Sequence, residues 1–539
     1  MTMRYSRRQA MQAAVATAAV AVIPLSQVAA QQATPAVANS GTVSRDQVKS
    51  ALTKLDALIE NAMTTTGVPG AAVAVVYQDE VVYERAFGVR EVGKPDAITP
   101  ETVFQLASMS KSISSTLVAA VIGDGATTWD AVASEILPEF KLSEPWWTAQ
   151  VTLRDLFSHR SGLPAYAGDG LTATFGYERD ESVHRLRYIS PASPIRTAFA
   201  YTNLGLSVAA YAAAEAAGQT WEELADERLF APLGMTTASY RLSDYASRAN
   251  KAAPHYRTRD GNWELGDVTD SDAASPAGGV STNVRDLTQW MRLQLGGGVF
   301  EGDEVVASAP LLETRRPQIL EGSPPDPADG PALFYGLGWR MHYDERGRLQ
   351  VHHIGDFSSG FRTGVSLLPT AGLGIVVLTN AWPNSLSDGI PKAFFELVDR
   401  GEVTEDWIGI LETQTAEGID AVRGFAPFPQ GDAPGGDPSL SPDSYTGSYT
   451  NELYGDIAVR EEDGNLVVEL GPQPFLLHLE HWDRDVFTYA LPPSGEVLLG
   501  RLGMQFSIGP FDQATSVQMG LPSVGPDGTA VFNRTEPVG

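Results

Sequence analysis

The sequence contains no cysteine, which excludes disulfide bonds, a thiol nucleophile and zinc sites built on cysteine. Basic residues are scarce: 38 lysines and arginines stand against 66 aspartates and glutamates, for a net charge of −28. Nucleic-acid binding needs a basic surface against the phosphates, so this charge argues against a nucleic-acid partner. With 43% hydrophobic and 19% charged residues over 539 positions, the chain is typical of a globular protein of about two or three domains.

Long apolar runs are also missing, apart from one near the N-terminus. There, a twin-arginine pair (7–8) precedes an apolar run (13–24), and small-residue cleavage sites end at positions 30 and 38. This order is typical of an export signal. A membrane anchor is the alternative, but the run is short, rich in alanine and interrupted by proline. We therefore predict a cleaved twin-arginine-type signal peptide over residues 1–38 and a periplasmic or secreted mature protein without stable membrane insertion.

Two kinds of hydrolase site find no support in the sequence. There is no G-x-S-x-G, the motif that carries the nucleophile of α/β-hydrolases. The histidines are scattered without metal-ligand spacing such as H-E-x-x-H. The adjacent pair His352 and His353 would point to opposite faces of a strand and could not bind one metal together. We predict a site that needs no metal and no cofactor.

The most informative feature present is Ser108-Met109-Ser110-Lys111, which lies where a strand-like stretch passes into a helical one. Residues at i and i+3 share one face of a helix, so Ser108 and Lys111 would lie side by side. A partly desolvated lysine at this place can lose its proton near neutral pH and serve as the base for the serine. The motif alone is weak, because a surface lysine on an ordinary helix is the common case.

Two further motifs carry polar groups suited to catalysis. In Tyr201-Thr202-Asn203, a phenol and a carboxamide two residues apart can face one cleft, where the phenol can move protons to and from a leaving group. A packed tyrosine and a turn-capping asparagine are the alternative. His353-Ile354-Gly355 belongs to a predicted edge strand.

The pattern of apolar residues predicts strands near both ends of the first 400 residues and helices between them. Strands are expected at 70–77 and 81–89, joined by a tight turn, and in a meander at 349–357, 363–368 and 374–379. Helices are expected at 48–63, 390–399 and 405–423. This order predicts an antiparallel sheet flanked by helices.

The remainder of the chain differs in composition. Residues 424–443 are rich in Pro, Gly, Asp and Ser, which is typical of a linker. Beyond them the pattern predicts only short strands, which favours a small barrel or sandwich over 444–539. The expected strands are 457–459, 466–470, 475–479, 486–489 and 497–499.

Together, the three motifs resemble the serine β-lactamase-like family, in its class C β-lactamase and D-peptidase branch. Further matches occur in the expected order, so the resemblance covers roughly residues 48 to 400. They are the segment ending in S-G-L-P (152–164), P-L-G-M (232–235), A-G-G-V-S-T (277–282) and Y-G-L-G-W (335–339). The resemblance implies an α/β (α+β) β-lactamase/transpeptidase-like domain over 39–423.

The C-terminal region is similar to a lipocalin-like domain that is fused to some of these hydrolases. Tyr445-Thr446-Gly447-Ser448-Tyr449 and Tyr454-Gly455 carry this resemblance. In such relatives the domain restricts access to the catalytic site. A domain that only stabilises the protein or mediates oligomers is the alternative.

The resemblance assigns a role to each motif residue. Ser108 matches the acylated nucleophile, Lys111 its base, Tyr201 the proton-shuttling tyrosine and Asn203 the residue that contacts the substrate amide. His353 and Gly355 match the substrate-binding strand, with His353 in the place of the lysine in K-T-G. The backbone N–H groups of Ser108 and Asp356 would form the oxyanion hole.

We therefore predict a serine hydrolase that cleaves amide bonds of short or unusual peptides through an acyl-enzyme. Candidate substrates contain D-residues, derive from cell walls or are linearised cyclic peptides, as in peptidases of the linearised-microcystin type. A carboxylesterase is the first alternative. A β-lactamase is disfavoured because His353 replaces the lysine that helps to anchor the β-lactam carboxylate. A non-catalytic binder of peptidoglycan or peptides would be expected to lack Ser108 or Lys111. The sequence makes no prediction of the oligomeric state.

Overall fold

The computed structural model describes residues 42–322, 331–424, 436–472, 475–491, 500–521 and 529–535. The predicted signal peptide (1–38), part of the predicted linker (424–443) and the predicted strand at 497–499 lie outside these residues. None of the described helices combines the length and the apolar character needed to cross a membrane.

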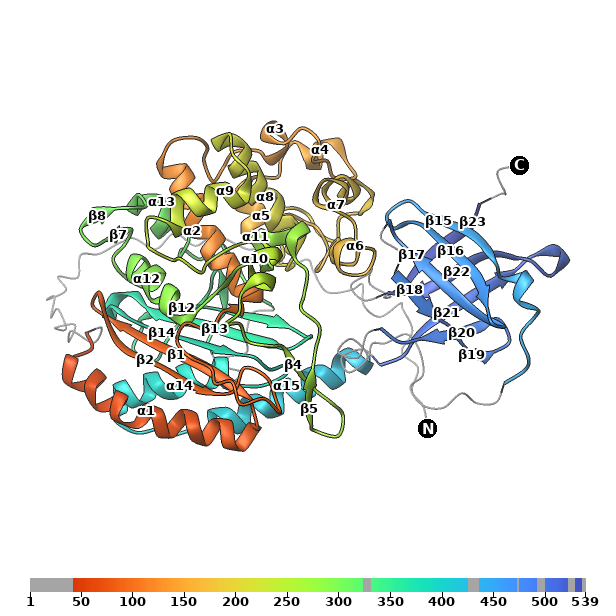
Figure 1. The fold of residues 1–539 in the computed structure, drawn as a ribbon. Helices are drawn as coiled ribbons and strands as arrows, with labels where there is room; N and C mark the ends of the chain where they lie inside the picture. Colours follow the sequence, from red (N-terminus) through yellow and green to blue (C-terminus); the bar gives the residue numbers. More distant parts are fainter. Residues whose placement is uncertain are drawn as a thin grey trace, which may run out of the picture. The chain divides into compact units, whose positions relative to one another are not determined.

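An eight-stranded antiparallel sheet forms the centre of the first region (Figure 1). Its strands in spatial order are β2 (Glu80–Gly88), β1 (Gly70–Tyr77), β14 (Leu373–Thr379), β13 (Phe361–Leu368), β12 (Leu349–Phe357), β11 (Arg340–Tyr343), β10 (Phe334–Tyr335) and β9 (Ile319–Leu320). The prediction of an antiparallel sheet is confirmed, and β1 and β12 have the predicted bounds. The prediction that His353 lies in an edge strand is wrong, because β12 pairs with both β11 and β13. The first and last predicted strands lie together because β1 pairs with β14.

Helices cover both faces of this sheet, and the side chains of β1 show why. All eight residues of β1 are buried. Because successive side chains point to opposite faces, Val73 and Val75 pack on α1 (Arg45–Thr66) and α14 (Leu386–Arg400). The small side chains of Ala72 and Ala74 face the other cluster, which includes α2 (Ser110–Gly123) and α12 (Val284–Leu295). Figure 1 shows α1 and α14 on one side of the sheet and α2 and α12 on the other.

The helical layer on the second face is built around two helices that are buried on all sides. Residues Ser110–Val121 of α2 and Leu204–Ala214 of α8 (Asn203–Ala217) are all buried. Both helices are rich in Ala, Ser, Val and Leu, so neighbouring elements can approach them from every direction. The other helices of this layer are α3 (Ala133–Ile136), α4 (Pro145–Thr148), α5 (Leu153–Phe157), α6 (Asp169–Ala173), α7 (Arg179–Arg185), α9 (Trp221–Ala225), α10 (Leu242–Ser247), α11 (Ser275–Gly278) and α13 (Ser308–Glu313).

The C-terminal region is a nearly closed all-β barrel, which confirms the predicted class. Among the described residues, nine strands form it in the order β18 (Phe475–His478), β17 (Asn465–Leu470), β16 (Gly455–Glu462), β15 (Gly447–Asn451), β23 (Thr529–Arg534), β22 (Ala514–Gly520), β21 (Leu502–Ile508), β20 (Val486–Tyr489) and β19 (Glu480–Asp483). Its buried side chains include Tyr449, Val468, Met504, Val517 and Phe532. After α14, helix α15 (Trp407–Gly424) ends the first region.

Candidate active site

Ser108 lies in a tight turn between a short strand and the buried helix α2. The turn is a 3-10 segment, η1 (Ala107–Met109), that follows β3 (Phe104–Gln105) and leads directly into α2. Ala107 has a φ of +48°, a left-handed conformation that is uncommon for alanine. The serine is thereby placed at the N-terminus of α2, where the helix dipole favours negative charge.

Lys111 is the second residue of α2 and is completely buried. Its Nζ is 3.0 Å from Ser108 Oγ, 2.6 Å from Asn203 Oδ1 and 2.8 Å from the carbonyl oxygen of Ala277. Burial lowers the pKa of Lys111 to about 7, against the opposing charge of the Asp169 carboxylate. A large fraction of the lysine is therefore neutral near pH 7.

The neutral form of Lys111 suits the geometry of its three neighbours. A neutral amine has two N–H donors and one lone pair. Asn203 Oδ1 and the Ala277 carbonyl oxygen can only accept hydrogen bonds, so the two N–H groups donate to them. The lone pair is then directed to the third neighbour, Ser108 Oγ, whose proton it can accept.

Tyr201 lies on the other side of the lysine. Nζ of Lys111 is 4.7 Å from the centroid of the Tyr201 ring. Burial raises the pKa of Tyr201, against a hydrogen bond with Ser108 that lowers it. The phenol therefore keeps its proton at neutral pH, and it can act as a proton donor next to Ser108.

The segment around His353 closes the site from the sheet. A Cβ on Gly355 would lie 2.0 Å from the carbonyl oxygen of Leu106 and 2.9 Å from the backbone nitrogen of Met109. Only glycine allows β12 to pass so close to the turn that carries Ser108, and Asp356 follows directly in the same strand. The oxyanion-hole role of the Ser108 and Asp356 N–H groups stays a prediction.

His353 is buried and neutral. Its Nδ1 is 2.8 Å from the carbonyl oxygen of Ile354, and its Nε2 is 2.9 Å from Tyr335 Oη. The carbonyl oxygen requires a proton on Nδ1, so Tyr335 donates to Nε2. Burial, reinforced by the charges of Lys111 and Arg340, holds the pKa of His353 well below its usual range. The substrate-binding role of His353 stays a prediction, and any group that binds its Nε2 must replace the Tyr335 hydroxyl.

The structure adds residues that the sequence analysis did not assign. Arg340 Nη1 lies 3.0 Å from Glu321 Oε1, and its positive charge lowers the pKa of Lys111, Tyr201 and His353. Asp169 accepts a hydrogen bond from Asn203 Nδ2 at 2.7 Å. Neither residue belongs to a motif, so no sequence signal identified them.

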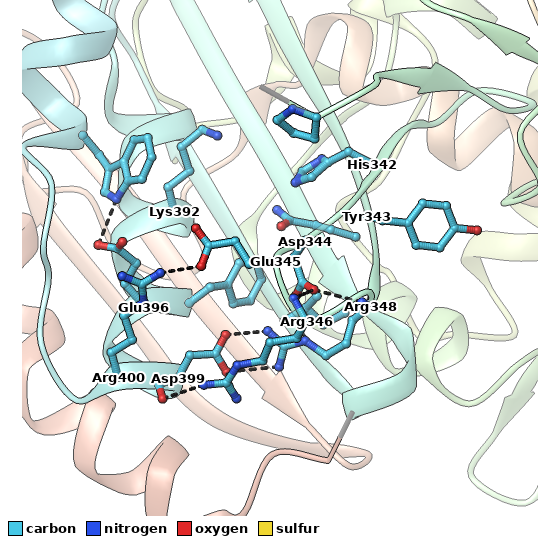
Figure 2. Close-up of a pocket in the computed structure, with 15 residues that line it drawn as sticks. His342, Tyr343, Asp344, Glu345, Arg346, Arg348, Lys392, Glu396, Asp399 and Arg400 are labelled. Carbon is cyan, nitrogen blue, oxygen red and sulfur yellow. Dashed lines mark hydrogen bonds and ion pairs between the residues drawn. The ribbon is translucent and has the colours of Figure 1, made fainter. Parts of the chain in front are cut away.

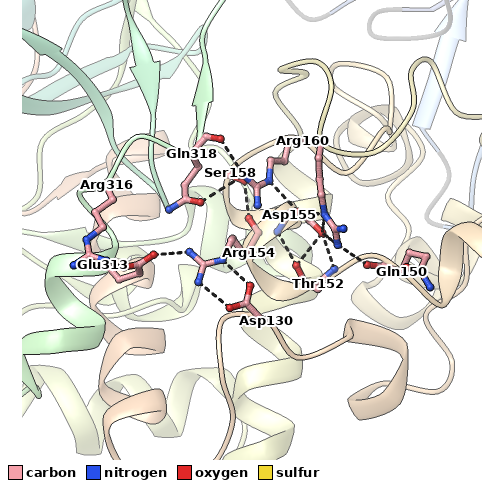
Figure 3. A network of polar contacts seen from close by, with 11 residues as sticks. Asp130, Gln150, Thr152, Arg154, Asp155, Ser158, Arg160, Glu313, Arg316 and Gln318 are labelled. Carbon is pink, nitrogen blue, oxygen red and sulfur yellow. Dashed lines mark hydrogen bonds and ion pairs between the residues drawn. The ribbon is translucent and has the colours of Figure 1, made fainter. Parts of the chain in front are cut away.

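A buried ion network supports the loop beside the site (Figure 3). Asp155 in α5 is fully buried and accepts hydrogen bonds from Thr152 Oγ1, Arg160 Nε and Arg196 Nη2, each at 2.9 Å. Arg160 directly follows His159, whose Nδ1 accepts the N–H of Thr202 at 3.1 Å. The network thus ties α5 to the segment that carries Tyr201 and Asn203.

A second pocket, of about 490 Å³, lies between α14 and the hairpin of β11 and β12. Its charged side chains largely pair with one another, as in Arg346–Asp399 at 3.1 Å and Arg400–Glu345 at 2.6 Å (Figure 2). Lys392 Nζ lies 5.1 Å from the centroid of the Trp407 ring. None of the predicted site residues lines this pocket.

Both regions of the chain are similar to known proteins. A family model described as Beta-lactamase matches residues 55–393, and one described as a domain of unknown function (DUF3471) matches residues 432–531. The unguisins hydrolase ungD′ of Aspergillus campestris is 24% identical over 431 residues, which are 76% of this chain and 78% of that protein. The D-alanyl-D-alanine-carboxypeptidase/endopeptidase AmpH of Escherichia coli is 24% identical, over 64% of this chain and 88% of its own. The octameric penicillin-binding protein homologue from Pyrococcus abyssi matches with a TM-score of 0.57 and 18% identity, over 89% of this chain and all of that one.

Proposed function

The chain belongs to the β-lactamase family, whose members are serine hydrolases, and from this premise we propose that it cleaves amide bonds of short peptides through an acyl-enzyme on Ser108. The observation that carries the proposal is the environment of Lys111. A buried amine with a pKa of about 7 lies 3.0 Å from the serine hydroxyl. These are the requirements for a general base that activates a serine.

Acylation begins when Lys111 takes the Ser108 proton while Oγ attacks the carbonyl carbon of the substrate. The tetrahedral intermediate then collapses, the C–N bond breaks and the leaving nitrogen needs a proton. Tyr201 is suited to deliver it, because burial keeps its phenol protonated and Ser108 lies beside it. The phenol regains its proton from the Lys111 ammonium, which restores the neutral amine.

Deacylation uses Lys111 as the base again. Lys111, neutral again, removes a proton from water as the water oxygen attacks the Ser108 ester. Oγ leaves and takes the proton back. The product is a carboxylic acid, and the site returns to its starting state without net consumption of protons from the protein.

The charge near the site favours a peptide over a neutral ester. Arg340, although paired with Glu321 at 3.0 Å, carries a positive charge whose field reaches Lys111, Tyr201 and His353. A cation at this place attracts a substrate that carries a carboxylate, as a short peptide does at its C-terminus. AmpH, a carboxypeptidase and endopeptidase by name, is a relative of this chain. We therefore favour D-residue-containing or cell-wall-derived peptides, with linearised cyclic peptides as a further class of the same chemistry.

Covalent labelling tests the nucleophile without knowledge of the substrate. We expect a fluorophosphonate probe to add one adduct to the wild-type protein, detected by intact-mass spectrometry, and none to Ser108→Ala. Ser50→Ala, which changes an exposed serine of α1, is the matched control and should label like the wild type. A folded wild-type protein that takes no adduct would contradict the proposal.

A substrate panel tests the proposed preference for peptide amides over esters and β-lactams. We expect turnover of D-aminoacyl anilides and D-Ala-terminated peptides, with weaker turnover of a chromogenic β-lactam. A nitrophenyl acyl ester serves as a positive control, because amidases of this type also cleave activated esters. Hydrolysis of the ester without any amide cleavage would make the protein an esterase and overturn the peptidase assignment.

A further inference from the structure

Asp169 is a partly buried acid that the catalytic steps above do not use. Desolvation raises its pKa to about 7, against the hydrogen bond from Asn203 and the charge of Lys111. Asp169 is the first residue of α6, and its Oδ2 accepts a hydrogen bond from Asn203 Nδ2 at 2.7 Å. Its other oxygen, Oδ1, is buried and has no hydrogen-bond partner among the described residues. A carboxylate in such a place is costly, so its position calls for a function.

The fold holds Asp169 firmly against the start of α8. The N–H of Tyr166 donates to the carbonyl oxygen of Tyr201 at 2.6 Å, which ties the loop to the residue two before Asn203. Gly168 has a φ of +83°, and a Cβ there would lie 2.8 Å from Leu204 Cδ2. The left-handed glycine therefore allows close packing of the loop on α8, and the next residue, Asp169, meets the Asn203 side chain.

This contact decides which way the Asn203 carboxamide points. A carboxamide presents an oxygen on one side and an NH₂ group on the other. Asp169 Oδ2 is an acceptor, so the Asn203 Nδ2 group must face it. The amide oxygen is then directed to Lys111 Nζ, at 2.6 Å. The reversed amide would place an N–H donor against Lys111 and would compete for the lone pair that Ser108 needs.

We propose that Asp169 is a positioning residue, which holds the Asn203 carboxamide with its oxygen toward Lys111 and thereby leaves the lysine lone pair to Ser108. This inference rests on the proposed function, because it concerns the activation of the same serine. Asp169 acts in two separable ways. Its acceptor oxygen orients Asn203. In its ionised form, which prevails above a pKa that burial raises to about 7, its negative charge favours the ammonium form of Lys111, against the effect of burial.

The rate at which the fluorophosphonate probe labels Ser108 measures this activation directly. We expect Asp169→Leu, which removes the acceptor at similar volume, to slow labelling by roughly tenfold or more at pH 8, the size of effect that the loss of one good hydrogen bond produces. Circular dichroism checks that the variant is folded, and Asp169→Ala repeats the measurement if the leucine variant unfolds.

A double-mutant cycle distinguishes positioning from a general structural effect. Asn203→Ala removes the group through which Asp169 acts, so Asp169→Leu should cause no further slowing in that background. Equal slowing by Asp169→Leu in both backgrounds would show that Asp169 does not act through Asn203 and would overturn the inference.

The isosteric variant Asp169→Asn separates charge from orientation. Asparagine can keep an acceptor oxygen toward Asn203 Nδ2, so we expect the labelling rate at high pH to change less than twofold. Loss of the negative charge should lower the pKa of Lys111 and move the midpoint of the pH profile to lower pH. An unchanged midpoint would contradict the charge effect.

The outcomes also separate this inference from the proposed function. A wild-type protein that labels, together with an Asp169→Leu variant that labels equally fast, overturns the inference alone. A folded wild-type protein that does not label overturns the proposed function and the inference with it.

Discussion

Two buried charged residues in the same helical layer, Lys111 and Asp155, are treated in opposite ways by the fold. Asp155 is surrounded by partners that stabilise its charge: two arginines and a threonine donate to it (Figure 3). Although burial acts to raise its pKa, these hydrogen bonds lower the pKa of Asp155 below its usual value. The carboxylate is therefore held permanently ionised.

Lys111 receives no comparable compensation. The atoms within hydrogen-bond distance of its Nζ are a hydroxyl, an amide oxygen and a backbone carbonyl oxygen, none of which carries a full negative charge. The acid whose charge acts on it, Asp169, contacts the opposite end of the Asn203 carboxamide. Burial therefore prevails and lowers the pKa to about 7.

The comparison teaches how burial can serve either stability or chemistry. A buried ion with full pairing keeps its charge and connects elements of the fold. A buried ionisable group with neutral partners has a pKa shifted toward its neutral form. A general base requires such a pKa near the working pH. The number and charge of the neighbours, not burial itself, decide which of the two results.

The largest effect is expected from removal of the base. Lys111→Met should reduce labelling of Ser108 by on the order of a thousandfold, since general base catalysis typically contributes a hundredfold to ten-thousandfold. The thermal midpoint should stay the same or rise, because a desolvated amine is replaced by an apolar side chain of similar length. Lys392→Met, at the second pocket (Figure 2), is the control and should keep full activity. A Lys111→Met variant that still labels at the wild-type rate would show that the buried lysine is not the base, and the functional contrast with the structural ion Asp155 would then be wrong.

Removal of the paired carboxylate should mainly affect stability. Asp155→Ala leaves two arginines without their buried partner, and we expect a loss of about 3–5 kcal/mol in the free energy of unfolding, measured by urea denaturation. Asp130→Ala is the matched control, because Asp130 pairs with Arg154 at the surface and its side chain is 70% exposed; the expected loss is below about 1 kcal/mol. Equal losses of unfolding free energy in the two variants would show that the buried ion pairs of Asp155 contribute no more to stability than the exposed pair of Asp130.

A change of pH, without any substitution, should distinguish the activity that depends on Lys111 from the stability that depends on Asp155. The neutral fraction of Lys111 falls about tenfold for each pH unit below its pKa, so the labelling rate should decline as pH drops below about 7. The Asp155 pKa is depressed on folding, so its contribution to stability is present above the unfolded pKa of about 3.9 and is lost only as pH falls further. Tryptophan fluorescence should thus report a folded protein at pH 5, where labelling is already slow. Unfolding that coincides with the loss of labelling would refute this separation.

Much of the fold could be predicted from local patterns. A continuous apolar run gave the bounds of β1, and the mixed segment LQVHHIGDF, followed by a turn, gave those of β12. The predicted tight turn between β1 and β2 is present, with Gln78 and Asp79 in the left-handed region. Helix α14 begins four residues before the predicted start and contains Pro391. Packing on the sheet holds the helix across this proline.

The candidate site was partly visible in the sequence. Spacing along one helix predicted that Ser108 and Lys111 would meet, and they do. Their approach to Asn203, 92 positions away, was expected only from the family resemblance. Asp169 and Arg340 could not be predicted, because their effect depends on which charges and amide groups of other segments they face.

By itself, the sequence determined the local chemistry: which residues could form the nucleophile and the base, where strands and helices alternate, and that a separate β region follows. These features depend on neighbours within one or two turns of the chain, so periodicity and spacing encode them. Only the tertiary structure decided the protonation of Lys111, the neutrality of His353 and the orientation of Asn203. Each of these depends on desolvation and on electrostatic partners that come from distant segments, and the chain acquires them only when it is folded.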